Sequence, residues 1–580
     1  MLYIKNKKTP ILILLTYILV AFVAMMPTTL NFSTYKYGSY KGSDSLGIIN
    51  SMWWYSKVNT KNKEGVAWNY SLGAPTGRKF SLSIVTPIPF LSHTISKLFN
   101  PIVGYNFIIF ISFVLAGICF HFVSYSFTRC HLSSFFGGIA YAISPFHLVQ
   151  AADHMSLAQT WVFPIWFYFF VNMYNQRSYR ASTYLILMTI GALIVHGYYG
   201  LFLLITQSIL FAYLLLKKKI KFKPANIKLL AYHYFSLLLL VLLWQHLSNI
   251  VKIGKNGDIT LFTRPISHLY IYGIRLYEFF LPPHYSLLFK NFSLEVIKAN
   301  PHSNYAEFTI FLGYTLLILS IWFCYKLLVQ DKLKKETSKL KKKLKKHQSL
   351  YTFDLDREII IFLFIILIIP FIFGFPPDIS ILGIKIPTMS KLMYNFLPML
   401  RTLSRFAILT IFAVCCLASF GLHVLIVNFS KRKKIIISFV MLFLVFVEFT
   451  NIHAHFYLDS TQIPGVYDEV KKIEGDSLIL DLPFNWGFFP AFWQTYHGKP
   501  LYNIFSPSHP NYKRIIKIQQ LKRLELIMQK CKELKITHIV VHTPMPLGIG
   551  KVFHNKVNKN TILPNFAKYS NLITIDNNEN

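Results

Sequence analysis

The sequence predicts a polytopic α-helical membrane protein with a small α/β domain at its C-terminal end. Of the 580 residues, 53% are hydrophobic, and uncharged apolar runs recur between residues 9 and 452. Most of these runs approach the roughly 20 residues that a helix needs to cross a bilayer. After residue 452 the long runs stop, and short strand-like segments replace them. This change of character divides the chain into a membrane part and a separate terminal domain.

The apolar runs predict about eleven transmembrane helices. The first covers residues 10–26 and follows Lys5, Lys7 and Lys8, which place the N-terminus in the cytoplasm. It lacks a convincing small-residue cleavage site, so we expect a retained helix rather than a signal peptide. The others are expected near residues 102–127, 132–148, 157–174, 181–195, a run ending at 216, 229–250, 308–328, 359–373, a run ending at 427, and 435–447.

The positive charge of the chain sets the expected topology. The formal net charge is +36, and much of the excess lies in short connections such as residues 217–219, 331–347 and 431–434. The positive-inside rule places these connections in the cytoplasm, and the 331–347 stretch is expected to be solvated. Attraction to anionic headgroups accounts for the remaining excess, so membrane lipids are expected partners and nucleic acid is not. The predicted location is the cytoplasmic membrane.

The same count places four segments and the terminal domain on the outer side. Residues 1–451 form the predicted membrane domain, and its first outer loop, residues 28–100, is large. Residues 84–99 contain Pro87 and Pro89 and are expected to lie along the membrane surface. Residues 452–580 are expected to form an extracytoplasmic α/β domain with strands near 477–482 and 537–542 and a helix over 514–534. The remaining outer segments are 150–154, 251–306 and 376–403.

The positions of the six cysteines argue against a disulfide scaffold and a structural zinc site. Four of them lie in apolar runs, and no CxxC pair or cluster of His and Cys occurs. A disulfide scaffold and a structural zinc site are therefore not expected.

Ionisable side chains gather in the segments predicted on the outer side. Asp44 precedes an aromatic run, residues 46–55, so its carboxylate is expected at a helix start. There it acts as a base or cation ligand, or serves only as an N-cap. Asp153 and His154 lie in the turn expected at residues 150–154. We take Asp44, Asp153 and His154 as candidate catalytic residues, because a carboxylate can serve as a general base.

Two arginines at the entry to the tenth predicted helix are candidate phosphate ligands. Arg401 and Arg405 are four residues apart, so they are expected to share one helical face. A guanidinium binds phosphate through two parallel hydrogen bonds, whereas the ordinary alternative is snorkelling to the membrane interface. Other outer ionisable residues are candidate substrate-binding groups, each with an alternative as an interfacial residue or a helix cap: Arg275, Glu278, His196 and Glu307.

Several short stretches match a known pattern. They are NYSLGAPTG at 69–77, YAISP at 141–145, LRTLSRF at 400–406, DLP at 481–483 and QTYHGKP at 494–500. Together with an acid after the first helix, Asp44, and another after the third, Asp153, they resemble the GT-C superfamily of integral-membrane glycosyltransferases. The resemblance is closer to the bacterial YfhO-like membrane proteins. Asp44 lacks an adjacent second acid, so the sequence does not match a DxD metal site. Whether the protein uses a divalent cation as a cofactor is left open.

The resemblance implies transfer of a sugar from a polyprenyl-phosphate-linked donor to a glycan or lipid acceptor of the cell envelope on the outer side. Two alternatives stay open: a flippase or transporter of lipid-linked sugars, and an envelope polysaccharide polymerase or ligase. A transporter requires polar residues spread through the helix interiors, whereas the candidate residues here gather on one side. This distribution favours a reaction at the surface.

Overall fold

The computed structural model describes most of the membrane part and the central portion of the terminal domain. The described residues are 8–38, 44–57, 68–79, 87–217, 224–252, 264–300, 305–340, 357–381, 383–450, 457–482, 488–504, 509–521, 524–542 and 570–574. The chain divides into two compact units. Unit 1 comprises residues 1–26, 110–151 and 156–454, and unit 2 comprises residues 27–109, 152–155 and 455–580.

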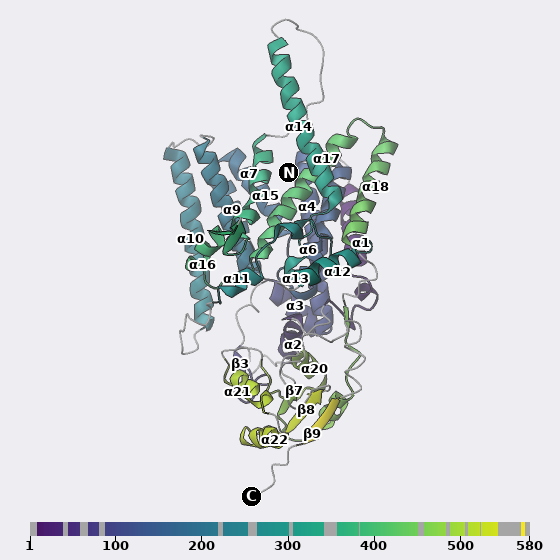
Figure 1. Cartoon of the computed structure of the whole chain (residues 1–580), viewed down its shortest axis with the longest axis vertical. Coiled ribbons are helices and arrows are strands. Elements are labelled where there is room, and N and C mark those ends of the chain that lie inside the picture. The colour runs from purple at the N-terminus through teal and green to yellow at the C-terminus, as the bar shows by residue number, and fades with distance from the viewer. Residues whose placement is uncertain are drawn as a thin grey trace. The chain divides into compact units, whose positions relative to one another are not determined.

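The regular structure in the described residues of unit 1 is helical apart from one hairpin, β4 (Asp378–Ile381) and β5 (Ile384–Pro387), which pair in antiparallel fashion (Figure 1). Its short elements are α11 (Ser267–Ile271), η4 (Leu276–Phe279), α12 (Lys290–Ala299), α13 (Tyr305–Phe308), α16 (Met389–Phe396) and η5 (Leu403–Phe406). The longer helices are α1 (Lys8–Ala24), α5 (His131–Ala142), α6 (Pro145–Asp153), α7 (Val162–Gln176), α8 (Tyr179–Val195), α9 (Gly197–Leu216), α10 (Pro224–Lys252), α14 (Tyr314–Leu340), α15 (Arg357–Phe373), α17 (Ala407–Ile426) and α18 (Lys431–Phe449). In addition, α4 (Pro101–Thr128) begins in unit 2 and continues into unit 1.

Helix α17 forms the core of unit 1. It packs against α5, α7, α14, α15 and α18, and nearly all its side chains are buried. Small residues permit the close approach: a Cβ at Gly421 would lie 2.1 Å from the main-chain oxygen of Leu319. The hydroxyls of Ser124 and Ser419 are 2.7 Å apart, so these two buried polar groups are hydrogen-bonded to each other within the apolar core. Helix η5 leads directly into α17, and its residues 403–406 are all buried.

Four helices in the described part of the chain are long and apolar enough to cross a membrane, or five if the bent pair α5 and α6 counts as one span. Shorter apolar helices lie at Thr9–Ala24, Tyr179–Val195 and Tyr314–Val329. Helices of the structure coincide with all the predicted apolar runs, which confirms a largely helical chain with membrane-type helices. How many of them cross the membrane, and in which direction, stays a prediction.

The third predicted helix differs from the structure. It is broken at Ser144–Pro145 into α5 and α6, which meet at an angle of 41°. Proline lacks an N–H and disfavours a helical conformation in the residue before it, so a new helix starts at Pro145. This second helix continues to Asp153, so the turn predicted at residues 150–154 was wrong in its extent. Of the basic 331–347 stretch, residues 331–340 continue α14 and residues 341–347 lie outside the described part.

Unit 2 combines parts of the first outer loop with the terminal region. Its sheet has the order β7-β8-β9, with β7 (Ile479–Leu482) parallel to β8 (His538–His542) and β9 (Ser570–Thr574) antiparallel to β8 (Figure 1). Two shorter helices replace the single helix predicted over 514–534. Ile515 and Ile527 place both helices on the same apolar core. The helices of this unit are η1 (Thr28–Leu30), α2 (Asp44–Lys57), α3 (Pro87–Leu98), α19 (Val466–Lys472), α20 (Phe489–His497), α21 (Pro510–Gln519) and α22 (Leu524–Glu533).

Backbone pairing within unit 2 ties the first loop to the terminal region. Strand β1 (Tyr35–Tyr37) pairs with β6 (Tyr457–Asp459), and Leu501 bridges both Leu72 and Ile479. A small hairpin, β2 (Trp68–Asn69) with β3 (Arg78–Lys79), lies in the same loop. Two segments far apart in sequence therefore form one folded body. The sequence-based boundary at residue 452 stays a prediction.

Candidate active site

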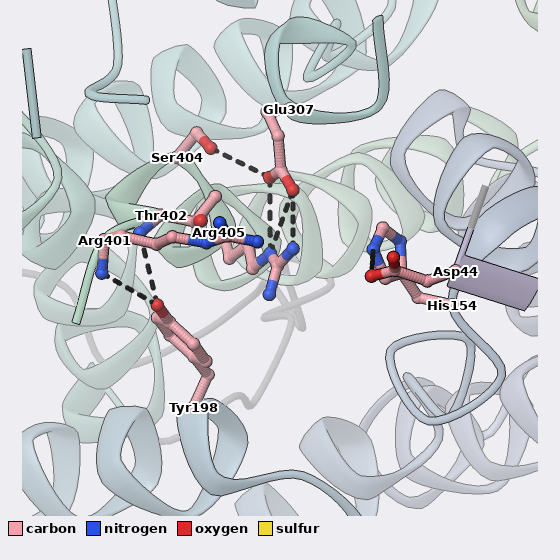
Figure 2. Close-up of polar contacts among 8 residues, drawn as sticks. All are labelled: Asp44, His154, Tyr198, Glu307, Arg401, Thr402, Ser404 and Arg405. Carbon is pink, nitrogen blue, oxygen red and sulfur yellow. Dashed lines mark hydrogen bonds and ion pairs between the residues drawn. The ribbon is translucent and has the colours of Figure 1, made fainter. Parts of the chain in front are cut away.

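The candidate catalytic residues Asp44 and His154 meet within unit 2. Asp44 begins α2, and its Oδ2 lies 4.0 Å from Nε2 of His154 (Figure 2). The Asp44 side chain is 62% exposed, whereas that of His154 is 23% exposed. An exposed carboxylate at a helix N-terminus is held by the dipole and by the imidazole, yet stays open to a reactant. We call Asp44, Asp153 and His154 the acid cluster.

A buried lysine that the sequence analysis missed lies close to the acid cluster. Lys36, in the middle of β1, is fully buried and interacts electrostatically with Asp153. Burial lowers the pKa of Lys36 to about 7, and the charge of Asp153 opposes this shift. In the sequence Lys36 is one lysine among many in a loop rich in tyrosine. The only local sign was its position between Tyr35 and Tyr37 in a strand-like stretch.

The second group of candidates, in unit 1, is organised around an ion pair. Arg405 donates from Nη2 to Oε1 of Glu307 at 2.6 Å, and its Nε also faces both carboxylate oxygens, at 3.2 and 3.3 Å (Figure 2). The two side chains are 8% and 3% exposed. Ser404 Oγ donates to Oε2 of Glu307 at 3.2 Å. The guanidinium fork is thus occupied by a carboxylate, and we call these three residues the buried ion-pair group.

Arg401 differs from Arg405 in both backbone and surroundings. The main-chain N–H groups of Arg401 and Thr402 donate to the hydroxyl of Tyr198 at 3.0 and 3.2 Å. Arg401 precedes η5, so the prediction that Arg401 and Arg405 share one helical face was wrong: Thr402, the N-cap of η5, has a non-helical backbone with φ −116° and ψ 83°. The guanidinium of Arg401 lies 5.9 Å from the Tyr272 ring centroid, and in the described part of the chain it forms no ion pair.

The other predicted substrate-binding residues serve local structure. Glu278 is buried and accepts from the main-chain N–H of Arg275 at 2.8 Å, while the guanidinium of Arg275 donates to the carbonyls of Gly273 and Tyr270. His196 is the N-cap of α9, where its Nδ1 accepts from the N–H of Tyr198 at 3.2 Å. These contacts match the helix-cap and turn alternatives, although a role in binding for Arg275, Glu278 and His196 stays a prediction.

A divalent cation has limited donors here. Among the residues that the structure describes, no group of three or more His, Cys, Asp and Glu side chains is placed to hold a metal ion. Asp44 and His154 together offer two ligands.

Buried amides brace the helix that carries Asp44. Nδ2 of Asn50, on α2, donates to the main-chain oxygen of Ala491 at 2.6 Å and to Oε1 of Gln494 at 2.9 Å. Nε2 of Gln494 donates to the main-chain oxygen of Ser71 at 2.6 Å. A Cβ at Gly47 would lie 2.7 Å from the ring of Phe488, so α2 and the start of α20 are in direct contact. The 494–500 motif therefore supports the first loop.

We expect Asn50→Ala to destabilise the chain by about 1–3 kcal/mol, because it leaves the buried Gln494 oxygen without its donor. The measurement is thermal unfolding of the full chain in detergent. Ser51→Ala is the matched control, since its hydroxyl donates within α2, to the Gly47 oxygen at 2.9 Å. Equal unfolding temperatures for the two variants would contradict a bracing role for Asn50.

No family model matches the sequence, and no curated protein sequence matches it. Among solved structures, the archaeal oligosaccharyltransferase AglB from Archaeoglobus fulgidus, in complex with an inhibitory peptide and a dolichol-phosphate, matches with a TM-score of 0.51 at 9% identity, over 92% of this chain and 70% of that one. The apo oligosaccharyltransferase from the same organism matches with a TM-score of 0.52 at 10% identity, over 93% and 70%. The chain has the GT-C fold.

The predicted GT-C fold is thereby confirmed. The arabinofuranosyltransferase AftD from Mycobacteria also matches, with a TM-score of 0.49 at 11% identity, over 93% of this chain and 35% of that one. At such identities the likeness concerns the fold, so the activity has to be argued from the residues of this chain.

Proposed function

We propose that the chain is a membrane glycosyltransferase that moves a sugar from a polyprenyl-phosphate-linked donor to a hydroxyl group of a cell-envelope glycan or lipid on the outer side of the membrane. The observation that carries the proposal is the acid cluster: an exposed carboxylate at the start of α2, 4.0 Å from an imidazole, in a chain with the GT-C fold. The GT-C fold is compatible with this reaction class, and Asp44 is the proposed base.

The proposed chemistry is one displacement at the anomeric carbon of the sugar. Asp44 takes the proton of the acceptor hydroxyl while the hydroxyl oxygen forms the new bond to that carbon. The bond from the anomeric carbon to the phosphate oxygen breaks, and its electron pair leaves with the polyprenyl phosphate. A protonated His154 would hold the Asp44 carboxylate in place, since the two groups are 4.0 Å apart. The departing phosphate gains negative charge, so a fixed cation next to it accelerates the step.

Within unit 1, Arg401 is the proposed ligand for the phosphate of a polyprenyl-phosphate donor. Arg405 is buried against Glu307, whereas Arg401 is only half buried, and its main chain is fixed by Tyr198. The guanidinium of Arg401 is therefore carried by a fixed backbone, and two of its N–H groups can form parallel hydrogen bonds to a phosphate.

We expect Arg401→Gln to weaken binding of a short-chain polyprenyl monophosphate about tenfold or more, since a charged hydrogen bond contributes roughly 1.5–3 kcal/mol. Arg401→Lys should recover only part of the affinity because it loses the fork. Binding is measured by the ligand-induced rise in unfolding temperature of the full chain in detergent, with the matching polyprenol, which lacks the phosphate, as the ligand control. Unchanged phosphate affinity in Arg401→Gln would remove this assignment.

The activity itself is tested by mass spectrometry of envelope glycans and glycolipids from cells with and without the gene. The expected result is loss of a sugar-sized mass from one class of envelope molecule, with accumulation of the polyprenyl-phosphate sugar. Accumulation of that lipid on the cytoplasmic face alone would indicate a flippase instead. Unmodified subunits of a polysaccharide would indicate a polymerase.

A further inference from the structure

Lys36 occupies a cage of main-chain oxygens. Its Nζ donates to the carbonyl oxygens of Tyr37 at 2.8 Å, Gly38 at 3.1 Å and Ala152 at 3.4 Å. The ammonium also lies 4.7 Å from the ring centroid of Tyr105, on α4. The three N–H groups of the ammonium thus have three carbonyl acceptors, and the charge also interacts with the face of an aromatic ring.

Burying an ammonium costs several kcal/mol even after relaxation, so a fully buried lysine must satisfy all its donors. Lys36 is 0% exposed. A lysine that only filled space in β1 could be replaced by an apolar residue at lower cost. The ammonium of Lys36 is therefore held by its three main-chain acceptors and not by packing alone.

The cage joins the first loop to the acid cluster. The Ala152 oxygen that Lys36 contacts belongs to the residue directly before Asp153 and His154. The main chains of Gly38 and Ala152 are in close contact at the same place. A Cβ at Gly38 would lie 2.1 Å from the Ala152 oxygen, and Gly38 has a φ of +76°. The two segments meet at this point through main chain, and the Lys36 ammonium adds a hydrogen bond of 3.4 Å between them.

We propose that Lys36 is a positioning residue of the acid cluster: its ammonium fixes residues 152–154 against the first loop, so that His154 meets Asp44 and Asp153 lies beside a built-in positive charge. The catalytic consequence rests on the proposed sugar transfer, whereas the placement of His154 does not. In the described part of the chain, the titratable residues that contact or interact with this cation are Tyr37 from β1, through its main-chain oxygen, Tyr105 from α4 and Asp153 from α6.

The pH dependence has opposite signs for activity and stability. The pKa of Lys36 is about 7 in the folded chain, against 10.5 for an ordinary lysine. The ammonium is present below pH 7, and its positioning effect is lost as the pH rises through 7. Between about pH 7 and 10 the unfolded chain holds a proton that the folded chain has released, so Lys36 makes stability rise with pH in that window. The rise in stability follows from the burial of Lys36 alone, whereas the loss of activity follows only if the ammonium positions the acid cluster.

Placement is tested without any activity measurement. In full-length chain with His154→Cys, a maleimide labels the new thiol, and the same chain without His154→Cys gives the background from native cysteines. We expect Lys36→Met to change the labelling rate about tenfold, while Lys57→Met, which replaces an exposed lysine on α2, leaves it unchanged. Equal labelling rates in the chain that keeps Lys36 and in the chain with Lys36→Met would overturn the proposal.

Activity is then measured with the polyprenyl-phosphate sugar that accumulates in the deletion strain. We expect Lys36→Met to lose at least tenfold in kcat with little change in donor KM, and the wild type to lose activity above pH 7. Lys36→Arg, which stays charged, should keep activity at pH 8.5. If Lys36→Met fails to fold, the wild-type pH profile decides: activity that does not fall as the pH rises through 7 overturns the proposal. If no sugar transfer exists, the labelling result alone decides the placement.

Discussion

We expect Asp44→Asn to lower sugar transfer by about 10²–10⁴-fold, the usual loss when a general base is removed. Asparagine keeps the size and much of the hydrogen bonding of Asp44 but cannot accept the proton of the acceptor hydroxyl. Folding should survive, because the side chain is 62% exposed and asparagine is also a good residue at a helix N-terminus. The check is restoration of the missing glycan in a deletion strain, with the protein level measured by blot.

Asp476→Asn is the matched control for this experiment, since Asp476 is an exposed acid of the same unit. It should restore the glycan fully. If Asp44→Asn did the same at normal protein level, Asp44 would be an N-cap only, and the base would have to be sought first at Asp153. An intermediate loss in Asp153→Asn is the expected result if Asp153 only supports the cluster.

Features set by local sequence could be predicted. The helical runs follow from the length of apolar stretches, so each predicted run coincides with helix in the structure. Asp44 at the start of a helix follows from a carboxylate placed before an aromatic run, and α2 begins there. The strands near 477–482 and 537–542 follow from short β-branched and apolar stretches, and the structure has β7 and β8 at those positions.

Features set by distant partners could not be predicted. Asn50 bonds a residue 444 positions away, and Arg405 bonds one 98 positions away. No period or motif in the sequence connects such pairs. The same limit explains the error about Arg401: a four-residue spacing predicts one helical face, but Tyr198 holds the backbone of Arg401 while Glu307 holds Arg405. Tertiary contacts therefore override local helical preference in this segment.

The buried ion pair of Glu307 and Arg405 gives the second large effect. We expect Arg405→Gln to destabilise the chain by about 3–5 kcal/mol, because it leaves a buried carboxylate without its partner. Glu307→Gln should cost a similar amount by leaving the guanidinium unpaired. The double variant, with both residues changed to Gln, should recover much of the loss, since neither charge then remains buried. The measurement is thermal unfolding of all four chains in detergent.

Lys530 and Glu533 form an ion pair in which both side chains are 50% exposed, and this pair is the matched control. Lys530→Gln should cost about 0–1 kcal/mol, since solvent screens such pairs. Additive losses in the Glu307 and Arg405 series would show that the two side chains do not depend on each other. That result would contradict their role as a structural pair.

The same variants separate structure from ligand binding. If Arg405 serves to hold the segment before α17, Glu307→Gln should leave affinity for polyprenyl monophosphate unchanged or weaker, because the backbone that presents Arg401 loosens. If Arg405 instead binds the donor phosphate, Glu307→Gln frees its guanidinium and affinity should rise. A rise would return Arg405 to the role predicted from sequence, together with Arg401. We expect no rise, because the Arg405 guanidinium is buried between the Glu307 carboxylate and the Tyr198 ring, whose centroid lies 5.2 Å away.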